Sequence, residues 1–134
     1  WNLSRKDVGS VRSVEETDLI LVNRERTKAG LDVLTKNPTL EEMASFFARK
    51  MAKSYGTEEI KTSFTGNMMR GRSVRAIHTA FMNSDRERCN ILNPDFKEFG
   101  VGAAKGEDGY IYICQLYDGE QFFLKCLDST GPSY

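Results

Sequence analysis

The sequence predicts a three-layer α/β/α sandwich, in which helices cover a small antiparallel sheet on both of its faces. Three observations lead to this fold class. Apolar residues recur at helical spacing in the first part of the chain and at strand spacing after residue 98. A turn signal joins two of the expected strands, and the resulting hairpin is apolar on both faces, so the sheet needs a cover on each side. The length of 134 residues is that of one domain.

The first helix is expected from about Val14 to Ala29, with residues 1–12 as an N-terminal arm and residues 13–134 as a single domain. Ser13 and Glu16 match a capping box, in which the two side chains satisfy free amide groups at a helix start. Gly30 is the expected stop of this helix. Four side chains are expected to point inward: Leu19, Ile20, Val22 and Asn23.

Two further helices follow along the chain. The second is expected after Asn37-Pro38, with a capping box from Thr39 to Glu42 and with Gly56 as its terminator. Its apolar residues stand at helical spacing: Leu40, Met43, Ala44, Phe47 and Met51. The third is expected over Ser73 to Asn83, with one apolar face formed by Val74, Ile77 and Phe81.

The last part of the chain reads as three strands, over Phe99–Ala104, Tyr110–Tyr117 and Gln121–Leu127. Asp118-Gly119 predicts a tight hairpin turn, because both of its central residues need positive φ. One face of this hairpin is expected to carry Ile111, Ile113, Phe122, Leu124 and Cys126. The other is expected to carry Tyr110, Tyr112, Cys114, Leu116 and Phe123.

Three cysteines allow at most one internal disulfide. Cys114 and Cys126 are expected on opposite faces of the hairpin, so a bond between them is not expected. Cys89 can meet only one of the two. The favoured interpretation is that all three thiols are free, since buried cysteine commonly acts as a small apolar residue.

Composition excludes some classes of partner. Lys plus Arg and Asp plus Glu both count 19, and this balance lacks the net positive charge typical of nucleic-acid-binding domains. The sequence holds no run of about 18 apolar residues, so no transmembrane segment is expected.

The chain carries three motifs in order, within residues 21–34, 37–44 and 80–102, and together they resemble the CAP superfamily of cysteine-rich secretory, antigen 5 and pathogenesis-related proteins. Residues 80–94, followed by Phe99-Gly100-Val101-Gly102, are similar to the W-M-x-S-P-G-H-R-x-N-I-L stretch and G-V-G strand of its bacterial-type branch. Residues 21–26 with Gly30 and Leu34 are similar to its first helix, and residues 37–40 with Ala44 to its second. The resemblance covers about residues 18 to 117 and implies the same α/β/α sandwich.

The resemblance also implies two His and two Glu around a central cleft, able to hold a divalent ion, and this chain departs from that set. Asn67 stands at one Glu position and Glu87 at one His position, while the single histidine, His78, lies on the expected third helix. One His among scattered carboxylates is a poor zinc site, so we expect no cofactor and no bound metal. Asn67, Glu87 and Arg88 then mark either a remnant cleft or a solvated turn with local charge pairing.

A second candidate surface is basic. Arg70, Arg72 and Arg75 form a local excess of arginine that suits an anionic lipid headgroup or an acidic patch on a protein partner. The alternative interpretation is an ordinary solvated face.

These observations lead to three function hypotheses. The first is a non-enzymatic binding or structural module that contacts a protein partner, either alone or as a subunit of a larger assembly. The second is a lipid- or sterol-binding secreted protein, and the third is a metal-dependent hydrolase. The resemblance implies a secreted or surface setting, with an intracellular complex subunit as the alternative.

Overall fold

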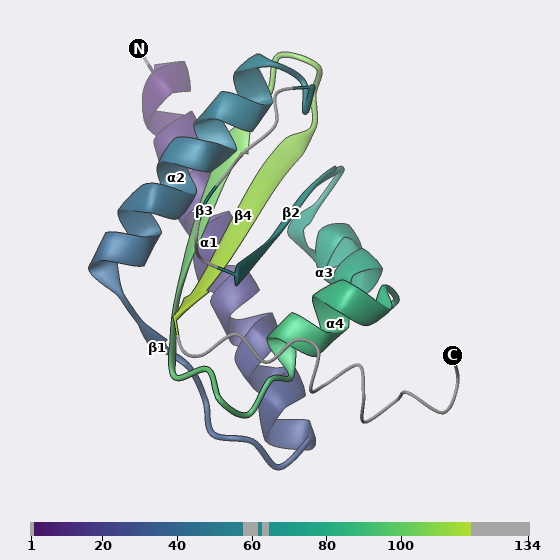
Figure 1. Ribbon diagram of the computed structural model, residues 1–134. Coiled ribbons are helices and arrows are strands. Elements are labelled where there is room, and N and C mark those ends of the chain that lie inside the picture. The colour runs from purple at the N-terminus through teal and green to yellow at the C-terminus, as the bar shows by residue number, and fades with distance from the viewer. Residues whose placement is uncertain (1, 58–61, 63–64, 119–134) are drawn as a thin grey trace.

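The computed structural model describes residues 2–57, 62 and 65–118, the first nine of them by their backbone alone. A four-stranded sheet in the order β1-β3-β4-β2 lies between two layers of helices (Figure 1). The predicted fold class is therefore confirmed. The elements are α1 (Asn2–Lys28), β1 (Thr35–Lys36), α2 (Pro38–Lys53), β2 (Thr65–Gly71), α3 (Val74–Met82), α4 (Asp85–Ile91), β3 (Glu98–Lys105) and β4 (Ile111–Asp118).

Each face of the sheet has its own apolar core. Helix α2 packs on one face, against Tyr112, Cys114 and Leu116 of β4. Helices α1, α3 and α4 pack on the other face, where β4 contributes Ile113 and Tyr117. The alternation predicted for residues 110–117 is therefore confirmed, and it follows from the period of two along a strand.

Helix α1 begins at Asn2, so the start expected at about Val14, after a capping box at Ser13, is wrong. Residues 2–12 contain no proline, which would break the helix. Ser13 is exposed, as serine in the middle of a helix commonly is. The inward stripe of α1 is Asp18, Leu21, Val22 and Arg26. Ile20 falls outside it and is exposed, which corrects the expectation that it points inward. The division between an arm of residues 1–12 and a domain of residues 13–134 stays a prediction.

Helix α2 starts earlier than its predicted capping box. Asn37 is the N-cap, and its side-chain oxygen accepts a hydrogen bond from the Leu40 amide at 3.1 Å. Pro38 takes the first helical position, where its missing N–H costs nothing and its fixed φ suits the helix. Helix α3 is confirmed, with Ser73 as its N-cap and with Ile77 and Phe81 buried.

Among the described residues, the sheet has four strands, of which the sequence predicted two. Strand β3 is confirmed, and β4 pairs with it in antiparallel register, with Gly102 opposite Cys114. Two strands were not predicted: β2 runs antiparallel to β4, and the short β1 runs parallel to β3, so the sheet is mixed. The predicted turn at Asp118-Gly119 and the strand over residues 121–127 lie outside the described residues.

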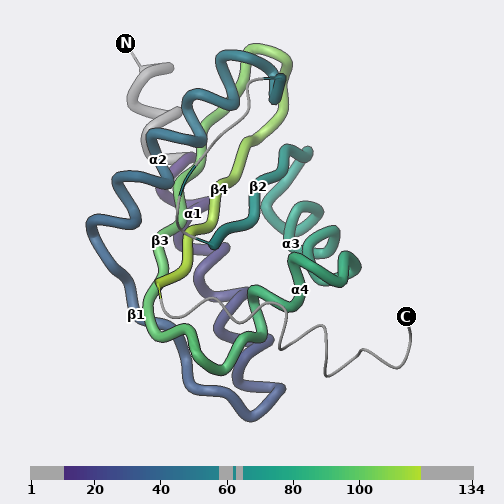
Figure 2. The backbone as a smooth tube through the Cα atoms, viewed as in Figure 1, coloured from purple at the N-terminus to yellow at the C-terminus, as the bar shows by residue number. Residues whose placement is uncertain are grey.

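Figure 2 traces the chain from β1 directly into α2, which then crosses the sheet above β3. Two glycines allow α2 to lie close to this strand. A Cβ at Gly100 would collide with the backbone at Leu40 and Glu41, and one at Gly102 with the backbone at Ala44 and Ser45. Gly100 and Gly102 of β3 therefore set the short distance between the sheet and α2.

We expect Gly102→Ala to destabilise the fold by about 1–3 kcal/mol, because the added methyl group meets helix backbone that has little room to move. Urea unfolding monitored by circular dichroism measures the change. The exposed Lys105→Ala in the same strand is the matched control, with an expected change within about 0.5 kcal/mol. Equal stability of Gly102→Ala and the wild type would show that α2 is free to shift.

Candidate functional site

Asn67, at a predicted remnant-cleft position, is a buried residue of β2 whose side chain is fully engaged. Its Nδ2 donates to the Glu87 main-chain oxygen at 3.1 Å and to Gln115 Oε1 at 3.0 Å. Its Oδ1 accepts from Asn90 Nδ2 at 2.8 Å. The structure therefore brings Asn67 and Glu87 together, but through the backbone of Glu87 and not through its carboxylate.

The side chains of Glu87 and Arg88 serve the start of α4. The Glu87 carboxylate accepts a hydrogen bond from Ser84 Oγ. Arg88 pairs with Asp85 at 2.7 Å and donates to the Met82 main-chain oxygen at 3.2 Å. Both residues lie inside helix α4 and not in the expected turn, and their side chains pair locally. A remnant cleft at Asn67, Glu87 and Arg88 stays a prediction.

Within the described ranges, no three residues of the types His, Cys, Asp and Glu gather in a way that could hold a metal ion. His78 is buried on α3, with Nε2 at 3.3 Å from Glu25 Oε2. No helix in the described part of the chain is long and apolar enough to cross a bilayer.

Of the three predicted basic residues, Arg70 has the most contacts with neighbouring side chains. Arg70 lies 3.2 Å from Asp108 Oδ2 and donates to the Tyr112 hydroxyl at 3.3 Å. The guanidinium groups of Arg70 and Arg72 both lie over the Tyr110 ring, at 4.7 and 4.8 Å from its centroid. Arg75 is exposed on α3. Arg70 is thus already engaged, and a basic contact surface that includes Arg72 and Arg75 stays a proposal.

The buried contacts of Asn67 belong to a larger network that the sequence analysis missed. Gln115 of β4 accepts from Tyr117 Oη at 2.8 Å and donates through Nε2 to Asp18 Oδ2 at 2.8 Å. Burial raises the pKa of Asp18 to about 7, although the Gln115 hydrogen bond acts in the opposite direction. Asp18 Oδ1 has no hydrogen-bond partner among the described residues. The available signal for this network in the sequence was Asp18, an acidic residue among the inward positions of α1.

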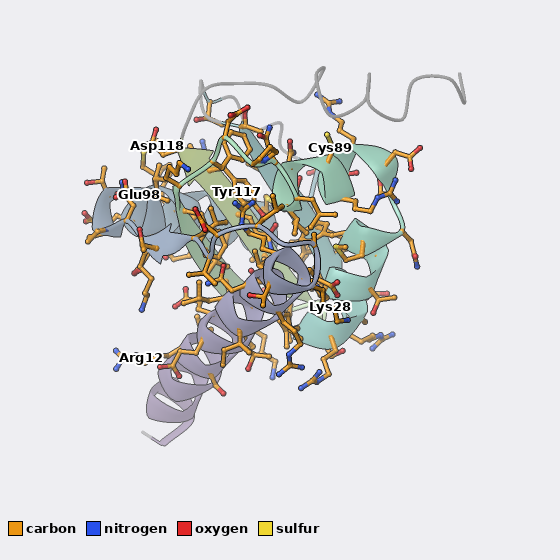
Figure 3. The ribbon with its side chains drawn as sticks, turned by 90° about the horizontal axis from the view of Figure 1, so that it is seen from below. Arg12, Lys28, Cys89, Glu98, Tyr117 and Asp118 are labelled. Atoms are coloured by element: carbon orange, nitrogen blue, oxygen red, sulfur yellow. The ribbon has the colours of Figure 1, made fainter. Side chains whose placement is uncertain are left out.

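Arg26 is the second buried polar anchor on α1. Its guanidinium donates to four main-chain oxygens, those of Asp32 at 2.8 Å, Ile91 at 2.9 Å, Asn93 at 2.8 Å and Phe96 at 3.3 Å. One turn earlier, Asn23 exchanges two hydrogen bonds with the backbone of Leu34. Figure 3 shows α1 from below, with Arg12 and Lys28 on well-separated turns. The helix thus holds the connections around the sheet by side-chain to backbone bonds.

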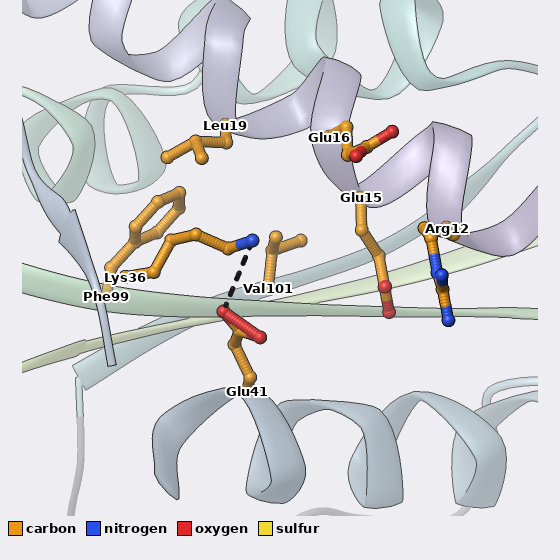
Figure 4. Close-up of a pocket in the computed structure, with 8 residues that line it drawn as sticks. All are labelled: Arg12, Glu15, Glu16, Leu19, Lys36, Glu41, Phe99 and Val101. Atoms are coloured by element: carbon orange, nitrogen blue, oxygen red, sulfur yellow. Dashed lines mark ion pairs between the residues drawn. The ribbon is translucent and has the colours of Figure 1, made fainter. Parts of the chain in front are cut away.

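A cavity of about 460 Å³ lies between α1 and α2, beside β3 (Figure 4). Arg12, Glu15 and Glu16 come from α1, Glu41 from α2, and Phe99 and Val101 from β3, with Leu19 and Lys36 completing the lining. A second hollow of about 580 Å³ shares Arg12 and Glu15 with the first and continues to Lys105. We call the two together the edge groove.

Known proteins are similar to this chain in sequence and in fold. The family model described as CAP, the cysteine-rich secretory protein family, matches residues 19–117. The chain belongs to this family. The uncharacterized protein YkwD of Bacillus subtilis (strain 168) is 30% identical over 134 residues, covering 86% of this chain and 51% of that protein. The chain therefore spans about half the length of that curated relative.

Solved structures of CAP proteins share the fold. An outer surface protein of Borrelia burgdorferi matches with a TM-score of 0.64 at 19% identity, covering 81% of this chain and 94% of that one. An extracellular protein of Bacillus anthracis that contains an SCP domain matches with a TM-score of 0.57 at 16% identity, covering 81% of this chain and 41% of that one. These similarities show the fold.

One expectation about the cysteines is wrong. Cys89 is disulfide-bonded, so the three thiols are not all free. Cys114 is free and buried among apolar residues, and burial raises the pKa of its thiol to about 12. A thiol with this pKa stays protonated near neutral pH and is a poor nucleophile.

The buried carboxyl of Asp18 predicts an unusual pH dependence of stability. Its pKa in the folded state is about 7 against an ordinary 3.8, so folding favours its protonated form. This contribution is present below about pH 4 and is lost as the pH rises to about 7. We expect Asp18→Asn to match the wild type within about 1 kcal/mol at pH 4 and to be more stable by about 2–4 kcal/mol at pH 8.

Urea unfolding of both proteins across this pH range measures the difference. Glu16→Gln, an exposed carboxylate on the same helix, is the control that should show no such divergence. A constant gap between Asp18→Asn and the wild type from pH 4 to pH 8 would contradict the prediction.

Proposed function

We propose that this chain is a non-enzymatic CAP module that acts by binding a protein partner. The family is generally non-catalytic, and its members often bind proteins or lipids. The observation that supports the proposal most directly is the side chain of Asn67. At a position where the family carries a carboxylate, this chain has an amide whose donors and acceptor are taken by Glu87, Asn90 and Gln115.

The residues that commonly act as base or nucleophile are poorly placed for catalysis in the described part of the chain. His78 is buried beside Glu25, and the Cys114 thiol is buried in the core beneath α2. A general base must reach the proton that it abstracts, and a thiol must ionise to attack. Both features support a role in binding.

An exported or surface setting is part of the proposal. CAP homologues are mostly secreted or surface proteins, and two structural relatives are named as outer surface and extracellular proteins. The disulfide at Cys89 supports the same setting, because such bonds persist in oxidising compartments.

Capture of a defined partner tests the binding function. The tagged chain is crosslinked in its own host, the complex is isolated, and the partner is made separately for a binding titration. Saturable one-to-one binding of the purified partner supports the proposal. A lipid that stays bound to the chain in native mass spectrometry, with no protein partner, would support the lipid-binding alternative instead.

The metal content gives an independent prediction. We expect protein purified without added metal to hold well below one zinc per chain by elemental analysis, because tight zinc sites need three or four nitrogen, thiolate or well-placed carboxylate ligands. Glu87→Ala should leave the content unchanged. Close to one zinc per chain, lost on Glu87→Ala, would overturn the non-enzymatic proposal and favour a metal-dependent hydrolase.

A further inference from the structure

The outer edge of β3 is mostly unpaired in the sheet. Strand β1 pairs with Glu98 and Phe99 alone, through hydrogen bonds from Thr35 to Lys97 at 3.0 Å and from Asn37 to Phe99 at 3.0 Å. Beyond this point the chain turns into α2. Because strand backbone groups alternate in direction, the N–H and C=O of Val101 and Ala103 face the same side as the Phe99 oxygen, away from β4.

A hydrogen bond to Glu15 of α1 shows that the Ala103 amide points away from β4. Glu15 Oε2 accepts this hydrogen bond from the Ala103 amide at 3.1 Å, which is where a carbonyl of an added strand would bind. No hydrogen bond to the Val101 backbone comes from a helix or loop in the described part of the chain. Unpaired edge groups of this kind are a template for another extended chain.

Charged side chains of both signs line the edge groove, and two of its carboxylates approach the unpaired edge from opposite sides. Glu15 comes from α1 and Glu41 from α2 (Figure 4). Arg12 and Lys36 line the same hollow, and Arg49 and Lys105 line the second one. Burial raises the pKa of Glu15, and the hydrogen bond from Ala103 lowers it. The charge of Glu41 raises this pKa further, and Arg12 and Lys36 each lower it by a smaller amount. Lys36 meets Glu41 only at 3.8 Å in a largely exposed pair. A cation placed between Glu15 and Glu41 would relieve this repulsion.

The shape of the edge groove restricts its occupant. Helices α1 and α2 flank the edge, so a second copy of this chain could not bring its own helix-flanked strand alongside β3. A lipid tail is a poor match, because charged side chains of Arg12, Glu15, Glu16, Lys36 and Glu41 line the hollow. A single extended peptide is narrow enough, and its backbone supplies the missing hydrogen-bond partners.

We propose that the edge groove binds an extended segment of a partner protein, which pairs with β3 at Val101 and Ala103 and places a Lys or Arg between Glu15 and Glu41. The bound segment lies beside β3 on the same edge as β1. A carbonyl of the segment replaces the Glu15 carboxylate as the acceptor of the Ala103 amide. This inference rests on the proposed binding function and identifies its surface and the chemistry of its partner.

The test uses a capped peptide of alternating Thr and Val with a central Lys, titrated into isotope-labelled protein and followed by NMR. We expect saturable shifts of the Val101 and Ala103 amide signals, and binding about tenfold tighter than that of the same peptide with a central Glu. A Lys peptide with N-methylated backbone amides should lose binding, because it keeps the charge but cannot pair with the strand. Equal binding by the Lys and Glu peptides, or shifts confined to other residues, would overturn the proposal.

Variants separate the two parts of the recognition. Glu41→Gln should reduce the preference for Lys to about threefold or less, whereas Glu42→Gln, the next residue on α2 and not part of the groove, should leave it unchanged. Ala103→Pro removes an amide that points away from β4, so it should fold and lose peptide binding. If that variant does not fold, the N-methylated peptide still tests strand pairing.

Two further outcomes would reject the groove as a peptide site. Sodium decanoate that shifts the Val101 and Ala103 signals while the Lys peptide does not would assign the groove to lipid. A captured partner that binds Glu41→Gln and Ala103→Pro as tightly as the wild type would reject the groove and leave the binding function standing.

Discussion

The side-chain amide of Gln115 is the interaction on which the arrangement of this fold depends. It donates to Asp18 of α1 and accepts from Asn67 of β2 and from Tyr117 of its own strand. Asn67 then holds the backbone of Glu87 and the side chain of Asn90, so α4 is positioned by the same network. The hydrogen bonds of this network hold its members in one arrangement, because a buried polar group that loses its partner carries the full cost of desolvation.

This network also restricts which side chain can stand at position 67. A carboxylate at position 67 would add a buried charge beside Gln115, whereas the amide of Asn67 supplies both the donors and the acceptor that its neighbours need. Arg26 has a similar role, since its guanidinium donates to the main-chain oxygen of Ile91 at the end of α4 and to that of Phe96 in the connection from α4 to β3. The buried polar residues of this region therefore stabilise the scaffold.

The sequence predicts the layers of this fold better than its sheet edges. Apolar alternation in β4 and helical spacing in α2 and α3 are local patterns, and the structure follows them. Strand β2 lacks such a pattern, because Thr65–Gly71 mixes glycine, amide and methionine, and it forms a strand only through its pairing with β4. The Gln115 network and the edge groove join residues that are distant in sequence, so no spacing reveals them. The remnant-cleft residues were found through family motifs, which give a position but not its hydrogen bonds.

The open edge of β3 follows from the chemistry of Asn37 and Pro38. Asn37 donates its backbone amide to Phe99 and its side chain caps α2, so the strand has to end there. Pro38 has no N–H to continue a ladder and is suited to a first helical position. Gly100 and Gly102 then let α2 lie directly over β3. Helix α2 thus covers the face of the strand but not its edge, and α1 approaches that edge with a carboxylate instead of a backbone. A groove with strand-pairing groups at its base and charged walls is the direct result of these local choices.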